Sequence, residues 1–99
     1  MCTRLEFPSN VYPWQHLADH GVRVKAIQPV DGGVTPQAVE DAITADTRLL
    51  AISAIQYATG HKTDLKAIGA ICKDRGILLC VDGIQQVGAA RLDVQELGI

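Results

Sequence analysis

The sequence has few aromatic residues, an odd number of cysteines and no long apolar run. Aromatic side chains make up 4% of the 99 residues, and three cysteines are present without a C-x-x-C pair. Two of the cysteines lie in apolar surroundings, where a thiol behaves as a small hydrophobe. No apolar run approaches the roughly 20 residues that a membrane-spanning helix needs, and residues 1–6 lack the apolar core of a signal peptide. These absences predict a reduced, cytoplasmic protein with no membrane contact.

An excess of positive charge is also missing. The formal net charge is −2, which predicts no nucleic-acid partner. The chain has no G-x-x-x-x-G-K-[ST] phosphate loop, so Gly32 and Gly33 are interpreted as part of a connector. His16 and His20 would share a helix face, but no third ligand accompanies them, and the sequence predicts no metal site. Its length is that of one domain with a single core, residues 1–99.

What the sequence does contain is an alternation of apolar runs and amphipathic segments. The order β-α-β-α-β-α-β gives parallel strands joined by right-handed crossovers. We therefore predict an α/β fold, a three-layer α/β/α sandwich around a mainly parallel four-stranded sheet. The predicted strands are 2–7, 22–27, 47–53 and 77–81, and the predicted helices are 13–19, 36–43, 64–74 and, briefly, 84–88. Residues 92–99 look like the start of a further element.

Capping residues flank the predicted helices. The strand 22–27 alternates apolar and charged residues, which is typical of a strand at the edge of a sheet. The predicted N-caps are Ser9 or Asn10, Thr35, and Thr63 or Asp64, and the predicted stops are Gly21 and Gly76.

Two other α/β folds of this length share the alternation. A receiver-like domain needs an acidic cluster at the end of its first strand, and residues 7–10 contain no acid. A flavodoxin-like domain needs a phosphate-wrapping first loop, which is also missing. Both folds are therefore less favoured.

A polar cluster is expected where two central strands end. The buried run 77–81 leads into Asp82, and open α/β sheets bind ligands beyond the carboxyl ends of their strands. Gln85 could turn back toward the same place. A simpler alternative is that Asp82 only caps a helix at 84–88, with Gln85 on its surface. The residues expected on this rim are Gln56, Tyr57, Thr59, His61, Asp82 and Gln85.

Three segments, in order along the whole chain, resemble one protein family. They are Glu6–Trp14, Gln56–His61 with the following Asp64 and Leu65, and Val81–Gln85, which contains an Asp-x-x-Gln motif after an apolar strand. The chain resembles the fold-type I pyridoxal-phosphate (PLP) enzymes of the class V aminotransferase and cysteine desulfurase group. The resemblance implies a sheet in which 2–7 lies between 22–27 and 47–53, with 77–81 beyond.

The resemblance also implies a cofactor site. The aspartate matching Asp82 pairs with the pyridinium nitrogen of PLP and keeps it protonated. The glutamine matching Gln85 hydrogen-bonds the phenolic oxygen of the ring. Many desulfurases carry an asparagine that contacts this oxygen where Tyr57 stands here. Cofactor binding is thus expected at Asp82, Gln85 and Tyr57.

The chain departs from the family at the position of the lysine that forms a Schiff base with PLP. In the family that lysine follows the Asp-x-x-Gln strand by a further strand. The lysines here all precede Asp82, and the small C-terminal domain of the family is absent. We therefore expect the middle part of a PLP-transferase large domain, with a vestigial half-pocket that does not hold PLP covalently and no catalytic residue of its own. The lysines are Lys25, Lys62, Lys66 and Lys73.

The departure leaves three functional hypotheses. The chain is a catalytically incomplete relative of these enzymes, a fragment recruited as a binding or interaction module, or one part of an enzyme that a second polypeptide completes. The strand 77–81 would have an exposed apolar edge, which a second copy, residues 92–99 folding back or strand exchange would bury. We therefore expect a homo-oligomer, either a homodimer or a larger assembly.

Overall fold

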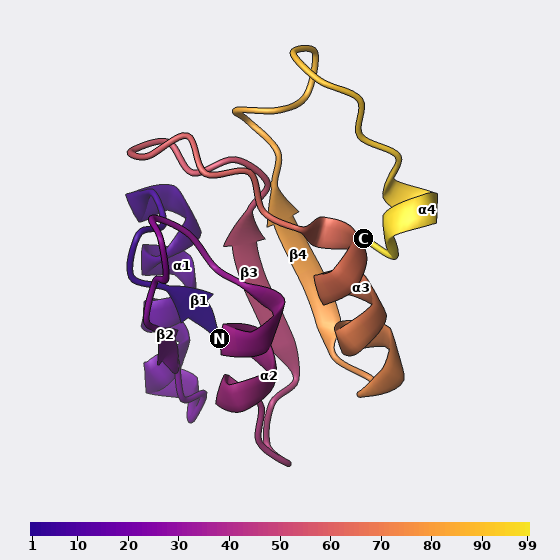
Figure 1. Cartoon of the computed structure of the whole chain (residues 1–99). Helices are drawn as coiled ribbons and strands as arrows, with labels where there is room; N and C mark the ends of the chain where they lie inside the picture. The colour runs from indigo at the N-terminus through magenta and orange to yellow at the C-terminus, as the bar shows by residue number, and fades with distance from the viewer.

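The computed structural model describes all 99 residues, which form one sheet of four parallel strands with helices on both faces (Figure 1). The α/β fold class is therefore confirmed. The strand order β2-β1-β3-β4 is also the order that the family resemblance implied. The strands are β1 (Cys2–Thr3), β2 (Ala26–Ile27), β3 (Leu49–Ser53) and β4 (Leu78–Asp82).

Two helices pack side by side on one face of the sheet (Figure 1). Helix α2 (Pro36–Ala42) begins where the Thr35 hydroxyl accepts the Ala38 N–H, at 3.2 Å. Helix α3 (Leu65–Asp74) begins where the Asp64 carboxylate accepts the Ala67 N–H, at 3.0 Å. Both caps agree with the sequence prediction, because a short oxygen-bearing side chain satisfies an N–H that has no partner within the helix. No helix of the chain combines the length and the apolar character needed to cross a membrane.

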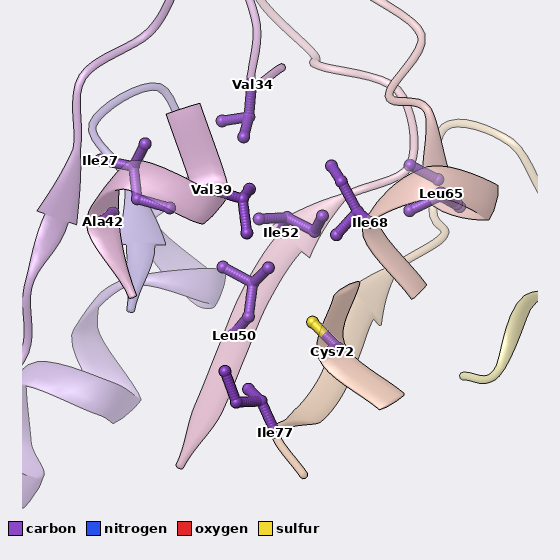
Figure 2. Close-up of a cluster of buried hydrophobic side chains, with 11 residues drawn as sticks. Ile27, Val34, Val39, Ala42, Leu50, Ile52, Leu65, Ile68, Cys72 and Ile77 are labelled. Carbon is purple, nitrogen blue, oxygen red and sulfur yellow. The ribbon is translucent and has the colours of Figure 1, made fainter. Parts of the chain in front are cut away.

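The core lies between β3 and these two helices (Figure 2). Leu50 and Ile52 of β3 are fully buried and point toward α2 and α3, as side chains two residues apart on a strand must share a face. Val39 of α2 and Ile68 of α3 lie on opposite sides of Ile52 in Figure 2. The buried core residues are Ile27, Val34, Val39, Ala42, Leu50, Ile52, Ala54, Leu65, Ile68, Cys72 and Ile77.

The opposite face is covered near the carboxyl end of the sheet by the segment that follows β1. This segment contains the 3-10 helix η1 (Pro8–Asn10), helix α1 (Tyr12–His16) and the 3-10 helix η2 (Leu17–His20). Ser53 of β3 points to this face and contacts Glu6. Leu78, at the amino end of β4, is left 70% exposed, so this part of the edge strand has no cover.

Several predicted elements are shorter than expected. The strand predicted at 2–7 ends at Thr3, whose hydroxyl accepts the Leu5 N–H and turns the chain out of the sheet. The strand predicted at 22–27 is regular only at 26–27. The charged residues before it form other contacts: Arg23 bonds to Asp46 in the loop before β3, and Lys25 Nζ donates to the Ala42 carbonyl at the end of α2.

The first helix also differs from the prediction. It runs only from residue 12 to residue 16 before it tightens into η2, and neither Ser9 nor Asn10 caps it. Asn10 is buried, and its side chain bonds to Glu6 and Trp14 instead. Gly21 ends η2 in the left-handed conformation, with φ of 80°, as expected.

The segment after β4 is not the predicted helix 84–88. The Gly83 carbonyl accepts the N–H groups of both Gln86 and Val87 at 2.8 Å, and the chain continues as turns through Gly88, where φ is 84°. A helix cannot continue through that left-handed residue. The chain then descends along α3 and ends in α4 (Val94–Leu97), which packs on α3 (Figure 1).

Candidate functional site

The candidate site lies where β3 and β4 end. Ser53 and Asp82 are paired in register, and the Ala54 N–H donates to the Asp82 carbonyl at 2.9 Å. The Asp82 side chain is half-buried, and its Oδ1 accepts the Ile84 N–H at 3.0 Å. Its Oδ2 has no partner within the chain, so one carboxylate oxygen is free at the end of a strand. Asp82 thus holds a turn, rather than capping the helix that the alternative required.

The two other predicted cofactor residues lie on the loops that leave this end of the sheet. Gln85 is exposed on the turns after β4, and its side chain makes no hydrogen bond within the chain. Tyr57 is 52% exposed on the loop between β3 and α3. Its ring meets Phe7 edge to face, with the centroids 5.2 Å apart and the planes at 89°. The structure therefore places Asp82, Gln85 and Tyr57 on one rim.

The remaining rim candidates have structural partners. The loop 54–63 folds back on itself through the Ile55–Lys62 bridge, and Thr59 Oγ1 donates to the Gly32 carbonyl at 2.6 Å. The His61 ring lies against Gly33. Gln56 is 1% exposed and points inward. Three of the six expected residues thus have contacts within the chain that shape the rim, although Thr59 itself is exposed.

Sequence reasoning missed the residue with the most side-chain hydrogen bonds in this region. Glu6 is 5% exposed, and its carboxylate accepts bonds from Asn10 Nδ2 (2.9 Å), the Ser53 N–H (3.0 Å), Ser53 Oγ and Gln56 Nε2 (2.7 Å). An acidic residue beside a short strand ordinarily indicates a solvated position. The available signal was its place at the start of Glu6–Trp14, one of the three segments that carry the family resemblance.

The buried thiols are not candidates for chemistry. Burial raises the pKa of Cys72. Burial also raises the pKa of Cys2, against the opposing effect of the chain-terminal ammonium and with a further contribution from Glu6. A thiol with a raised pKa stays protonated at neutral pH and is a poor nucleophile.

These features define a class of protein: a parallel α/β unit with a polar rim at the carboxyl ends of its central strands, where ligands of such sheets bind, and a free carboxylate where a half-buried strand ends. The chain belongs to the aminotransferase class-V family, whose model matches residues 1–99.

The chain is similar to cysteine desulfurases over almost its whole length. It is 39% identical over 95 residues to a probable cysteine desulfurase of Methanothermobacter thermautotrophicus, covering 95% of this chain and 24% of that protein. It is 37% identical over 98 residues to a probable cysteine desulfurase of Borreliella burgdorferi, covering 97% of this chain and 23% of that protein. It thus spans about a quarter of the length of these relatives.

A solved structure shows the same fold. The crystal structure of the cysteine desulfurase CsdA (S-sulfonic acid) from Escherichia coli superimposes with a TM-score of 0.91 at 26% identity, over 99% of this chain and 25% of that one. The predicted family and fold are therefore confirmed together.

The family depends on PLP, and the donor set of the rim suits the ring of this cofactor. Asp82 offers a free carboxylate oxygen, which is the group that pairs with a protonated ring nitrogen. Gln85 offers an unused amide, which can donate to a phenolic oxygen. The residues present thus fit the ring of PLP.

Proposed function

We propose that this chain forms the ring-contacting half of a PLP site and holds the cofactor without a covalent bond. The observation that carries the proposal is the free Oδ2 of Asp82 at the end of β4. In this site Asp82 binds the ring nitrogen, Gln85 donates to the phenolic oxygen, and Tyr57 contacts the ring from the loop after β3. When bound, PLP supplies an electron sink for a carbanion next to its ring. The carboxylate of Asp82 keeps the ring nitrogen protonated, which that chemistry requires.

The proposal includes no catalysis by the 99 residues alone. Within residues 1–99 the four lysines all precede Asp82. In this proposal a residue outside these 99 supplies the covalent anchor and the usual proton carrier. A second polypeptide that supplies the lysine would complete the site, and the names of the relatives point to cysteine as the substrate of the completed enzyme. The free cysteines fit the reducing cytoplasm, which is the proposed location.

A PLP titration followed by absorbance tests the proposal. We expect a saturable spectral change in the wild-type chain and in Asp74→Ala, a matched control at the far end of α3, and its loss in Asp82→Ala. Borohydride reduction and intact mass should then show no single lysine adduct. A flat wild-type titration, or a change that survives in Asp82→Ala, would refute the ring site. One stoichiometric adduct on one lysine would refute the non-covalent mode.

An interaction role is a second proposal, and the exposed edge of β4 favours it. Strand β4 is last in the sheet, and its peptide groups at Leu79 and Val81 face away from β3, because alternate residues bond to the one neighbour. Residues 78–81 carry no charge, so two copies can approach without repulsion. We propose that a second copy pairs along this edge.

Light scattering after size exclusion tests this pairing. The wild-type chain should elute as a dimer, and Leu78→Lys should shift it to the monomer, because a charge then lies at the contact. Ile84→Lys introduces the same charge at a site that is 80% exposed but outside the strand, and it should leave the dimer intact. A monomeric wild type, or equal effects of the two lysines, would contradict the proposal.

A further inference from the structure

Glu6 is a buried acid that the proposed ring site does not use. No cationic side chain pairs with it, and all four of its hydrogen bonds come from neutral donors. Oε1 accepts from the Ser53 N–H and Gln56 Nε2, and Oε2 accepts from Asn10 Nδ2 and Ser53 Oγ. Every one of the roughly four acceptor sites of a carboxylate is thus occupied. An amide of the same shape would present its own N–H groups to some of these donors.

The hydrogen bonds of Glu6 join parts of the chain that are distant in sequence. Ser53 lies 47 residues away and Gln56 lies 50 residues away. Ser53 is the register partner of Asp82, so the carboxylate holds the strand end that lies beside the proposed nitrogen ligand. The Asn10 amide donates to the same carboxylate, which connects the turn that leads into α1 to Glu6.

The residues that follow Glu6 and Gln56 in the sequence are also in contact. Glu6 and Gln56 are bonded in the interior at 2.7 Å, and their sequence neighbours Phe7 and Tyr57 meet as an exposed aromatic pair. The buried bond therefore sets the spacing at which the two rings meet above it. The bond between Glu6 and Gln56 thereby fixes the position of Tyr57 on the rim.

The amide of Gln56 shows that Glu6 imposes the arrangement. Its Nε2 faces the carboxylate, and this leaves Oε1 buried without a hydrogen-bond donor. A buried acceptor without a partner is costly and rare in native proteins. The amide keeps this orientation because the alternative would direct an oxygen at the carboxylate.

We propose that Glu6 is the positioning residue of the rim, acting through Gln56 on Tyr57 and through Ser53 on the strand end at Asp82. It does not touch the ring itself. The proposal deepens the proposed function and rests on it, since Tyr57 and Asp82 contact a ligand only in that site.

A swap of the two side chains separates positioning from general stability. Glu6→Gln places an amide donor against the donors of Ser53 and Gln56. The double variant Glu6→Gln/Gln56→Glu restores a carboxylate–amide bond between the two positions with its direction reversed. Glu40→Gln is the matched control, because Glu40 lies on α2 and pairs only with Arg75 at the surface.

The first readout is the PLP dissociation constant of each folded variant, measured by absorbance. Because Glu6→Gln disrupts hydrogen bonds to a charged group, we expect its PLP affinity to fall about tenfold. The affinity should recover to within about threefold of wild type in the double variant and stay unchanged in the Glu40→Gln control. Unchanged affinity in Glu6→Gln would overturn the proposal. A loss that the double variant fails to reverse would also overturn it, because the effect would then be general destabilisation. Where Glu6→Gln does not fold, Ser53→Ala replaces it, and a loss of affinity in this folded variant supports the role while unchanged affinity overturns it.

The second readout does not depend on the cofactor. Hydrogen exchange of the amides in residues 54–58 should be faster in Glu6→Gln and slow again in the double variant, while amides of α2 stay unchanged. If the wild-type chain binds no PLP, the proposed function fails and this readout alone decides the positioning role. Exchange that is unaltered in Glu6→Gln, or faster throughout the chain in both variants, overturns it.

Discussion

The imidazole ring of His61 lies against the α-carbon of Gly33, so close that a β-carbon on residue 33 would come within 1.9 Å of Cδ2 and 2.2 Å of Cγ. The contact joins the loop after β3 to the turn after β2. The hydrogen bond from Thr59 Oγ1 to the Gly32 carbonyl ties the same two loops together. The rim that carries Tyr57 is therefore supported from the side by a segment far away in sequence.

Gly33→Ala should force these loops apart. The clash involves Cγ, the ring atom bonded to the β-carbon of His61, so turning the ring about χ2 does not relieve it. We expect a loss of about 1–3 kcal/mol in the free energy of unfolding. Urea denaturation measures the loss. His61→Ala in the same chain should recover most of it, because the obstructing ring is gone. A double variant as unstable as Gly33→Ala would show that the contact is not the cause.

Gly69→Ala should release the C-terminal segment while leaving α3 intact. A β-carbon at residue 69 would lie 2.1 Å from the Leu97 carbonyl oxygen, which is backbone and cannot move alone. Alanine itself favours the helix by about 1 kcal/mol over glycine, so α3 should persist. Trypsin should then cut after Arg91 faster than in the wild type. Ala70→Ser, one residue further along on the exposed side of α3, should leave the cutting rate unchanged.

The two ends of α3 should respond with opposite signs to the same substitution. Asp64→Ala removes the cap on the Ala67 N–H and should cost about 1 kcal/mol, while Asp64→Asn should cost much less. Asp74→Ala removes a negative charge from the last residue of the helix, where it opposes the helix dipole, and should stabilise by about 0.3 kcal/mol. Thermal or urea unfolding checks both. Destabilisation of similar size at both ends would contradict the assignment of Asp64 as the cap.

Stability should fall at alkaline pH because of Cys72. Burial raises the pKa of its thiol above the ordinary 9.0, so the folded chain keeps a proton that the unfolded chain loses. The stabilising contribution is fully present below pH 9.0 and is lost as the pH rises through the folded pKa. The free energy of unfolding, measured from neutral to alkaline pH, should therefore decline less steeply in Cys72→Ala than in the wild type. Parallel profiles would exclude this thiol as the source.

The elements that the sequence predicted well are those that local chemistry determines. Thr35 and Asp64 cap their helices as expected, because a cap depends on residues within one turn. The apolar strands β3 and β4 were found within two residues of their bounds. Their patterns are long enough to identify a buried strand without knowledge of the rest of the chain.

The features that the sequence could not predict depend on distant contacts. Glu6 is buried because its donors arrive from 47 and 50 residues away, and nothing next to it in sequence indicates this. Turns take the place of the helix predicted at 84–88. Of the candidate site, the position of Asp82, Gln85 and Tyr57 on one rim was predictable, whereas the inward orientation of Gln56 was not.

The hydrogen bonds around Asn10 have an experimental consequence. Trp14 is the only tryptophan of the chain, and its indole N–H donates to Asn10 Oδ1 at 3.2 Å, while the Asn10 amide donates to Glu6. The emission of a single indole thus reports on the polar network beneath the rim. Stopped-flow fluorescence, excited selectively at the indole, can follow how fast that network assembles during refolding, in the unlabelled protein and with no second tryptophan to resolve.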